Sequence, residues 1–161
     1  MADDDLEFIT PPNALKSKVS IGGAGAVDEA ALRRAEEAIA GMTDEYLEWV
    51  VQDIARIEAA CKELKSSSDE RVEKLQGVFQ VAHDIKGQGG SFGFDLMTTI
   101  GNQVCQVIDK ADSDDPDIVD VIDVHVDAMK LIVASRLKGD GGRDGELMLA
   151  GLQKVCEKIL N

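Results

Sequence analysis

The chain has 161 residues, a length that suits one domain with a real hydrophobic core. Aliphatic residues supply most of its 44% hydrophobic content, only 4% is aromatic, and proline is nearly absent after residue 12, which favours an all-helical fold. The formal net charge of −14 at pH 7 would repel nucleic acid and anionic membranes, and this argues against any function built on a basic patch.

The cysteines and the first residues bear on the cellular compartment. Cys61, Cys105 and Cys156 are odd in number, widely spaced and placed among apolar helical positions. This pattern argues against a disulfide framework or a zinc site and predicts buried, reduced thiols. The acidic start, Met1–Asp5, precedes no long apolar run, so neither a signal peptide nor a transmembrane helix is expected and the protein should be cytoplasmic.

The first 27 residues differ in composition from the rest of the chain. Prolines and a glycine cluster interrupt them, and only scattered apolar residues could pack, so residues 1–27 are expected to form a flexible N-terminal arm. A helix is predicted over 28–40, where Gly41 ends it. Residues 28–161 are expected to form a single helical domain.

The second predicted helix begins at Thr43, which is expected to be its N-cap. Its apolar residues recur with alternating spacings of three and four, which is typical of a bundle seam: Leu47, Val50, Ile54, Ile57, Cys61 and Leu64. Tyr46 and Trp49 lie off this seam and are expected to give partial cover. A short serine loop follows, in which Ser67 and Glu70 fit a capping box for the next helix.

Three further helices with apolar stripes are predicted over about 69–90, 95–111 and 116–137. Asp115 is expected to cap the last of these, with Pro116 at its first position. Helices of this length with short links suit an antiparallel up-down four-helix bundle over about 43–137. The predicted fold is therefore all-α: this bundle with an additional N-terminal helix and a C-terminal helix over about 144–160.

One stretch, Ala82 to Gly93, carries the candidate site. It holds His83, one of two histidines, and then places three glycines within little over one turn. A glycine inside a helix costs about 1 kcal/mol relative to alanine, which suggests that something must approach the backbone there. If the helix continues, His83, Gly87 and Gly90 share one face and Lys86 lies at its edge. The apolar stripe before His83, including Phe79, places the imidazole beside the core but open to solvent.

The pattern His83-x-x-Lys86-Gly87, followed by small residues and Gly93, resembles the motif of histidine phosphotransfer (HPt) domains over roughly residues 43–137. The resemblance implies that His83 is phosphorylated and that Lys86 stabilises the phosphoryl group. It also implies that Gly87 and Gly90 leave room for a docking partner. Gln88-Gly89-Gly90 departs from the small Ser or Ala residues usual in the family, which leaves the exact position of Lys86 open.

The resemblance also implies the partners. These are receiver domains of response regulators, with a hybrid histidine kinase as a further candidate, and Mg²⁺ is expected in the partner receiver domain and no cofactor or metal in this chain. Neutral imidazole, whose unperturbed pKa is about 6.5, is a competent nucleophile for a phosphoryl group. Phe79 and Gln103 are expected to join the docking surface, and Gln103 could hydrogen-bond the imidazole. The chain is expected to be a monomer without ATP-dependent catalysis of its own.

Alternatives remain open. The run from His83 to Lys86 also resembles the histidine box of the dimerisation and phosphoacceptor region of histidine kinases, although that region usually has a proline soon after the histidine. A module that docks a receiver domain without transfer would present the same face. A metal phosphohydrolase built on His83 and Asp84 would need ligands that the chain lacks. Asp84 is expected to be solvated, and His125, on an apolar stripe, to be buried and not a second phosphorylation site.

Overall fold

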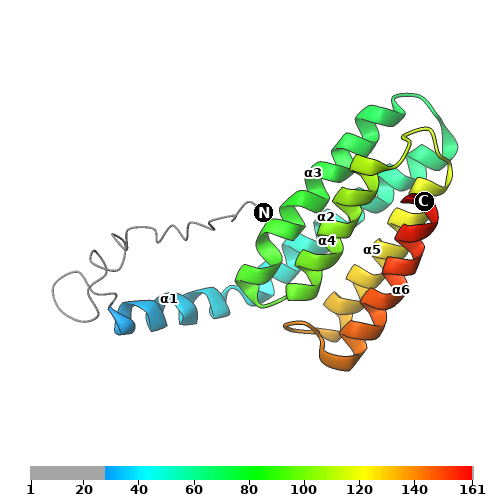
Figure 1. The fold of residues 1–161 in the computed structure, drawn as a ribbon. Coiled ribbons are helices and arrows are strands. Elements are labelled where there is room, and N and C mark those ends of the chain that lie inside the picture. The colour runs from blue at the N-terminus through cyan, green and yellow to red at the C-terminus, as the bar shows by residue number, and fades with distance from the viewer. Residues whose placement is uncertain (1–27, 161) are drawn as a thin grey trace, which may run out of the picture. The chain divides into compact units, whose positions relative to one another are not determined.

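The computed structural model describes residues 28–160, and every regular element in them is helical (Figure 1). The elements are α1 (Glu29–Gly41), α2 (Thr43–Ser66), α3 (Arg71–Gly89), the 3₁₀ helix η1 (Gly90–Phe92), α4 (Asp95–Lys110), α5 (Asp117–Ser135) and α6 (Gly142–Leu160). No strand occurs within this range, so the all-α prediction is confirmed. The predicted flexible arm, residues 1–27, lies outside the described residues.

Two compact units divide the chain, Met1–Ala38 and Ile39–Asn161. Most of α1 belongs to the first unit, and the predicted N-terminal helix is present there. The second unit holds α2 to α6 and the candidate site, and the following paragraphs concern it.

Helices α2 to α5 form a closed ring of four neighbours. Helix α2 packs against α3, α3 against α4, α4 against α5, and α5 returns to α2. Short links join successive helices of 16 to 24 residues, or about 24–36 Å, so neighbours run antiparallel. Helix α6 packs against α4 and α5. The predicted four-helix bundle with a C-terminal helix is confirmed.

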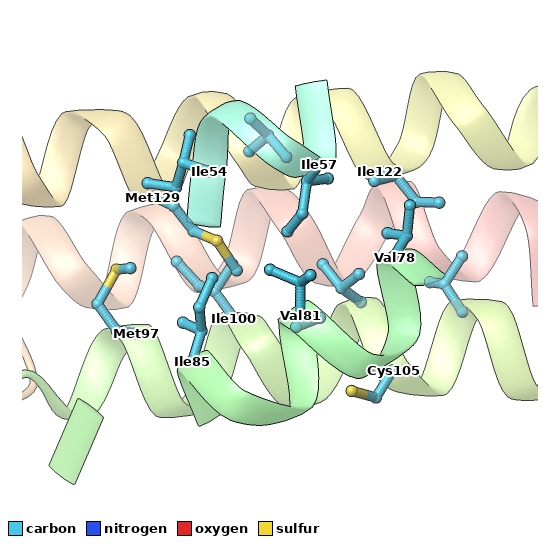
Figure 2. Close-up of a cluster of buried hydrophobic side chains, with 14 of the residues drawn as sticks. Ile54, Ile57, Val78, Val81, Ile85, Met97, Ile100, Cys105, Ile122 and Met129 are labelled. Atoms are coloured by element: carbon cyan, nitrogen blue, oxygen red, sulfur yellow. The ribbon is translucent and has the colours of Figure 1, made fainter. Parts of the chain in front are cut away.

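The core fills the centre of this ring. Figure 2 shows side chains from all four helices turned toward one another, among them Ile54, Ile57, Val81, Ile85, Ile100 and Met129. The apolar seam predicted for α2 is buried along its whole length. Tyr46 corrects one expectation, because it is completely buried while Trp49 stays 44% exposed. Tyr46 precedes Val50 by four residues and therefore shares the buried face; its ring stacks on Phe92 with centroids 4.4 Å apart.

The predicted helix caps have mixed outcomes. Thr43 is the first residue of α2 and not its cap, and its hydroxyl donates to the Ala40 carbonyl. The capping box at Ser67 is wrong, because α3 begins only after Glu70, and the Ser67 hydroxyl accepts from the Asp69 amide instead. Helix α5 begins at Asp117 with Pro116 at its cap position, one residue later than predicted, although the Asp115 carboxylate does accept from the Asp117 amide at 2.9 Å.

The link from α3 to α4 is fixed by backbone hydrogen bonds. The Phe94 amide donates to the Gly89 carbonyl at 2.8 Å, and Gly93, with φ 77°, makes the left-handed turn that glycine favours. The Gly139 amide, between α5 and α6, donates to the Gly93 carbonyl at 2.7 Å, and the Leu96 amide donates back to Gly139. The end of α3 that carries the candidate site is therefore anchored to the opposite side of the bundle.

None of the helices in residues 28–160 combines the length and apolar character needed to cross a membrane.

Candidate functional site

His83 lies in the C-terminal half of α3 with its side chain exposed. Its neighbours Ala82 and Ile85 are buried in the core, at 0% and 1% exposure. Packing of these two residues fixes the helix while leaving the imidazole in solvent, because residues one and two positions apart on a helix face different directions. The prediction that His83 stands beside the core and open to water is confirmed.

Phe79 forms one wall beside the imidazole. It precedes His83 by one turn, is half-buried, and its ring stacks on the His83 ring with centroids 6.2 Å apart and planes 17° from parallel. Helical side chains lean toward the N-terminus of their helix, which brings the imidazole over Phe79. The His83 ring therefore has an apolar ring as its neighbour one turn earlier on α3.

Asp84 does not take part in this arrangement. Its carboxylate accepts a hydrogen bond from Gln80 Nε2 at 3.1 Å, on the exposed side of α3. The expected solvated position of Asp84 is confirmed, and the hydrogen bond to Gln80 holds the carboxylate away from His83.

Lys86 supplies the cation nearest to His83 along the helix. It is half-buried and forms no ion pair or hydrogen bond with any residue in the described range. The charge of Lys86 acts on Cys105 in α4. Burial raises the pKa of the Cys105 thiol, and the nearby Lys86 ammonium partly counteracts this rise in pKa. The positive charge of Lys86 is thus available to an incoming anion.

The three clustered glycines have different surroundings. A Cβ on Gly87 would meet no atom within 4 Å, and one on Gly90 would touch only Asp95 and Thr98 side-chain oxygens at 3.7 Å. Nothing in the described chain therefore requires glycine at Gly87 or Gly90. A Cβ on Gly89 would lie 2.9 Å from the Phe94 carbonyl oxygen and the Thr98 amide nitrogen, so Gly89 is required by helix packing.

Gly101 is a residue near the site that the sequence pattern alone does not single out. It is buried in α4, and a Cβ there would lie 2.9 Å from the Ala82 carbonyl oxygen and 3.1 Å from the Lys86 amide nitrogen. A glycine inside an otherwise strongly amphipathic helix is the available signal, since such a glycine commonly marks close packing.

Gln103 does not form the hydrogen bond expected of it. Its Oε1 atom is buried and has no partner among the described residues, so the imidazole of His83 does not donate to it. Gln103 follows Gly101 by two residues, which places it about 200° around α4 from the residue that contacts α3. It therefore faces away from the helix that carries His83.

The second histidine, His125, is completely buried in α5. Its Nδ1–H donates to the Val121 carbonyl at 2.7 Å, and the Cys156 thiol of α6 donates to Nε2 at 3.4 Å. Burial lowers the pKa of His125. The expectation that His125 is a buried histidine is confirmed, and the three cysteines are buried free thiols as predicted.

Within residues 28–160, no group of three or more His, Cys, Asp or Glu side chains could hold a metal ion.

Comparison with known protein families bears on this arrangement. A family model described as Hpt domain matches residues 41–132, which is more than half of the chain and covers α2, α3, α4 and most of α5. No curated protein and no solved structure gives a match. The chain therefore belongs to the Hpt domain family, whose members carry out histidine phosphotransfer in two-component signalling.

Proposed function

We propose that His83 accepts a phosphoryl group from the aspartyl phosphate of one receiver domain and passes it to the aspartate of another. The observation that carries this proposal is the contrast between the two histidines of a chain from the Hpt family. His83 is exposed on α3, whereas His125 is 0% exposed and bonded through both ring nitrogens.

The chemistry requires little beyond a presented imidazole. The lone pair of a ring nitrogen attacks phosphorus, the N–P bond forms, and the bond from phosphorus to the receiver carboxylate oxygen breaks with its electron pair. In the second transfer the carboxylate of another receiver attacks phosphorus, and the N–P electron pair returns to the imidazole. Positioning and charge neutralisation dominate such phosphoryl transfers.

Lys86 serves as the cation that stabilises the phosphoryl oxygens in this proposal. It lies three residues after His83, hence on an adjoining part of the helix face, and no described carboxylate neutralises it. A chain with net charge −14 would otherwise repel an anionic group, so an unpaired ammonium beside the imidazole lowers that cost.

Phe79, Gly87 and Gly90 form the docking surface around His83 in this proposal. The two glycines leave a low strip at the end of α3 and the start of η1, and Phe79 offers an apolar contact beside the imidazole. A receiver domain could approach the backbone closely there. The receiver would bring its own Mg²⁺, and the chain would act as a monomer that takes no phosphoryl group from ATP directly.

The decisive experiment compares the wild-type chain with His83→Gln after incubation with receiver domains charged by acetyl phosphate. The wild type should gain an acid-labile phosphoryl group and hand it to a second receiver, while His83→Gln should gain none. A matched control, His125→Asn, should retain transfer.

Other outcomes would overturn the proposal. Binding of receivers without phosphorylation would indicate a docking module, and labelling of His83 by ATP alone would indicate a kinase-like protein. A tight dimer in sedimentation analysis would favour the dimerisation and phosphoacceptor alternative.

A further inference from the structure

Gly101 touches the one turn of α3 that carries both His83 and Lys86. A Cβ at Gly101 would lie 2.9 Å from the Ala82 carbonyl oxygen, 3.1 Å from the Lys86 amide nitrogen and 3.2 Å from Lys86 Cβ. Residues 82 and 86 are the acceptor and donor of one i to i+4 helical hydrogen bond, and His83 lies inside the turn that this bond closes. Helix α4 therefore supports that turn from beneath.

The contact is part of a close approach between α3 and α4. One turn further along α4, the Cys105 thiol donates to the Phe79 carbonyl at 3.8 Å, and one turn before it the Thr98 hydroxyl accepts from the Gly90 amide at 2.9 Å. These two contacts hold α4 on either side of Gly101. A side chain at Gly101 would thus push against a turn whose flanks are fixed.

We propose that Gly101 is a positioning residue for phosphoryl transfer, one that sets the place of the Lys86 ammonium relative to the His83 ring. The inference rests on the proposed function of His83. An added Cβ at Gly101 would meet the Ala82 carbonyl oxygen and both the amide and the Cβ of Lys86, whereas the His83 side chain is exposed, so added bulk shifts the turn and moves the Lys86 side chain relative to the His83 ring. The opposing atoms belong mainly to the backbone and cannot rotate away.

The test is a double-mutant cycle between Gly101→Ala and Lys86→Met. The measured quantity is the rate at which His83 is phosphorylated by potassium phosphoramidate, followed by intact-protein mass. In the wild type, Lys86→Met should slow phosphorylation by about tenfold, the loss expected for a hydrogen bond to a charged group. In the Gly101→Ala background the same substitution should slow it by less than about twofold, because Lys86 is already displaced.

Gly89→Ala is the matched control. It crowds the same α3–α4 contact, with Thr98 and Phe94 backbone atoms 2.9 Å from the added Cβ, but lies beyond the turn of His83 and Lys86. Lys86→Met should keep its full effect in the Gly89→Ala background, because the turn of His83 and Lys86 is not crowded there. If Gly101→Ala is incompletely folded by circular dichroism, all variants are compared in trimethylamine N-oxide, which favours the compact state.

Two failures are distinguishable. An equal effect of Lys86→Met in the wild-type and Gly101→Ala backgrounds would overturn the positioning role while leaving the proposed function intact. Absence of any phosphoryl group on His83 in the wild type, from phosphoramidate or from charged receiver domains, would overturn the proposed function itself.

Discussion

The rings of Phe79 and His83 lie nearly parallel, 17° apart, with their centroids separated by 6.2 Å. The aromatic ring thus flanks an imidazole whose residue is exposed to solvent. A nucleophile held this way loses less conformational freedom when it reacts, which is the ordinary advantage of preorganisation.

Replacing Phe79 by leucine should slow phosphorylation of His83. Stacked ring pairs contribute about 0.5–1.5 kcal/mol beyond their buried area, so the rate should fall by about two- to tenfold as the imidazole gains freedom. The rate with phosphoramidate measures this effect without a docking partner. The control is Leu75→Val, which shortens a buried side chain one turn before Phe79 on the same helix. An equal loss of rate in Leu75→Val would show that general destabilisation causes the effect.

Gly87→Ala should separate stability from docking. Because a Cβ at Gly87 meets nothing within 4 Å, the substitution should raise the free energy of unfolding by up to about 1 kcal/mol. Transfer from a charged receiver should nevertheless fall by about tenfold or more, since small misplacements of reacting groups are costly.

Gly77→Ala is the matched control for that experiment. Gly77 is also an exposed glycine inside α3 with open space around it, but it lies before His83 and outside the proposed docking surface. It should stabilise the protein similarly and leave transfer unchanged. Unimpaired transfer in Gly87→Ala would remove Gly87 from the docking surface.

Stability should depend on pH through His125. Burial lowers its pKa below the usual histidine value of 6.5, with the hydrogen bond to Val121 acting in the opposite direction. The unfolded chain therefore binds the proton more readily than the folded one. The free energy of unfolding should be fully retained above pH 6.5 and should decline below it, by at most about 1.4 kcal/mol per pH unit.

Urea unfolding at a series of pH values on both sides of 6.5 measures this decline. His125→Asn keeps an amide that can donate toward the Val121 carbonyl and cannot take up a proton in this range. Its pH dependence should be shallower than that of the wild type. Parallel curves for the two proteins would show that other groups cause the decline.

Gln103→Leu should stabilise the bundle. The Oε1 atom of Gln103 is buried without a hydrogen bond in the described chain, and removing an unsatisfied buried polar group recovers about 1–3 kcal/mol. Chemical denaturation measures the gain. The same variant also tests the docking role expected of Gln103, because that role requires a clear loss of phosphotransfer rate. Gln76→Leu, at an exposed glutamine of α3, is the control for surface effects.

The spacing of apolar residues in the sequence is sufficient to predict which residues of a single helix are buried and which are exposed. The seam from Leu47 to Leu64 predicts the buried face of α2, and the spacing of His83 from the apolar residues of α3 predicts its exposure. The prediction for Tyr46 is wrong although this residue lies one turn from Val50, because a seam that begins at Leu47 leaves it out. Each of these outcomes depends only on the 3.6-residue period.

Features that depend on how two helices approach one another cannot be predicted this way. Gly89 and Gly101 are required by atoms of a neighbouring segment within 3 Å, and no single-helix pattern encodes that distance. The hydrogen bond expected between Gln103 and His83 is absent for the same reason, since the contact of Gly101 with α3 places Gln103 on another side of α4. From the sequence alone, Gly89 and Gly101 are recognisable as unfavourable residues inside helices, but the neighbouring atoms that require them are not.

Of the two histidines in the sequence, only His83 is exposed, and this has a kinetic consequence under the proposed function. Donor and recipient domains must occupy the same place on α3, so they exclude each other and visit in turn. The two exchanges should then follow ping-pong kinetics, with parallel lines in double-reciprocal plots. A surplus of unloaded recipient would compete with the donor and slow the overall flux.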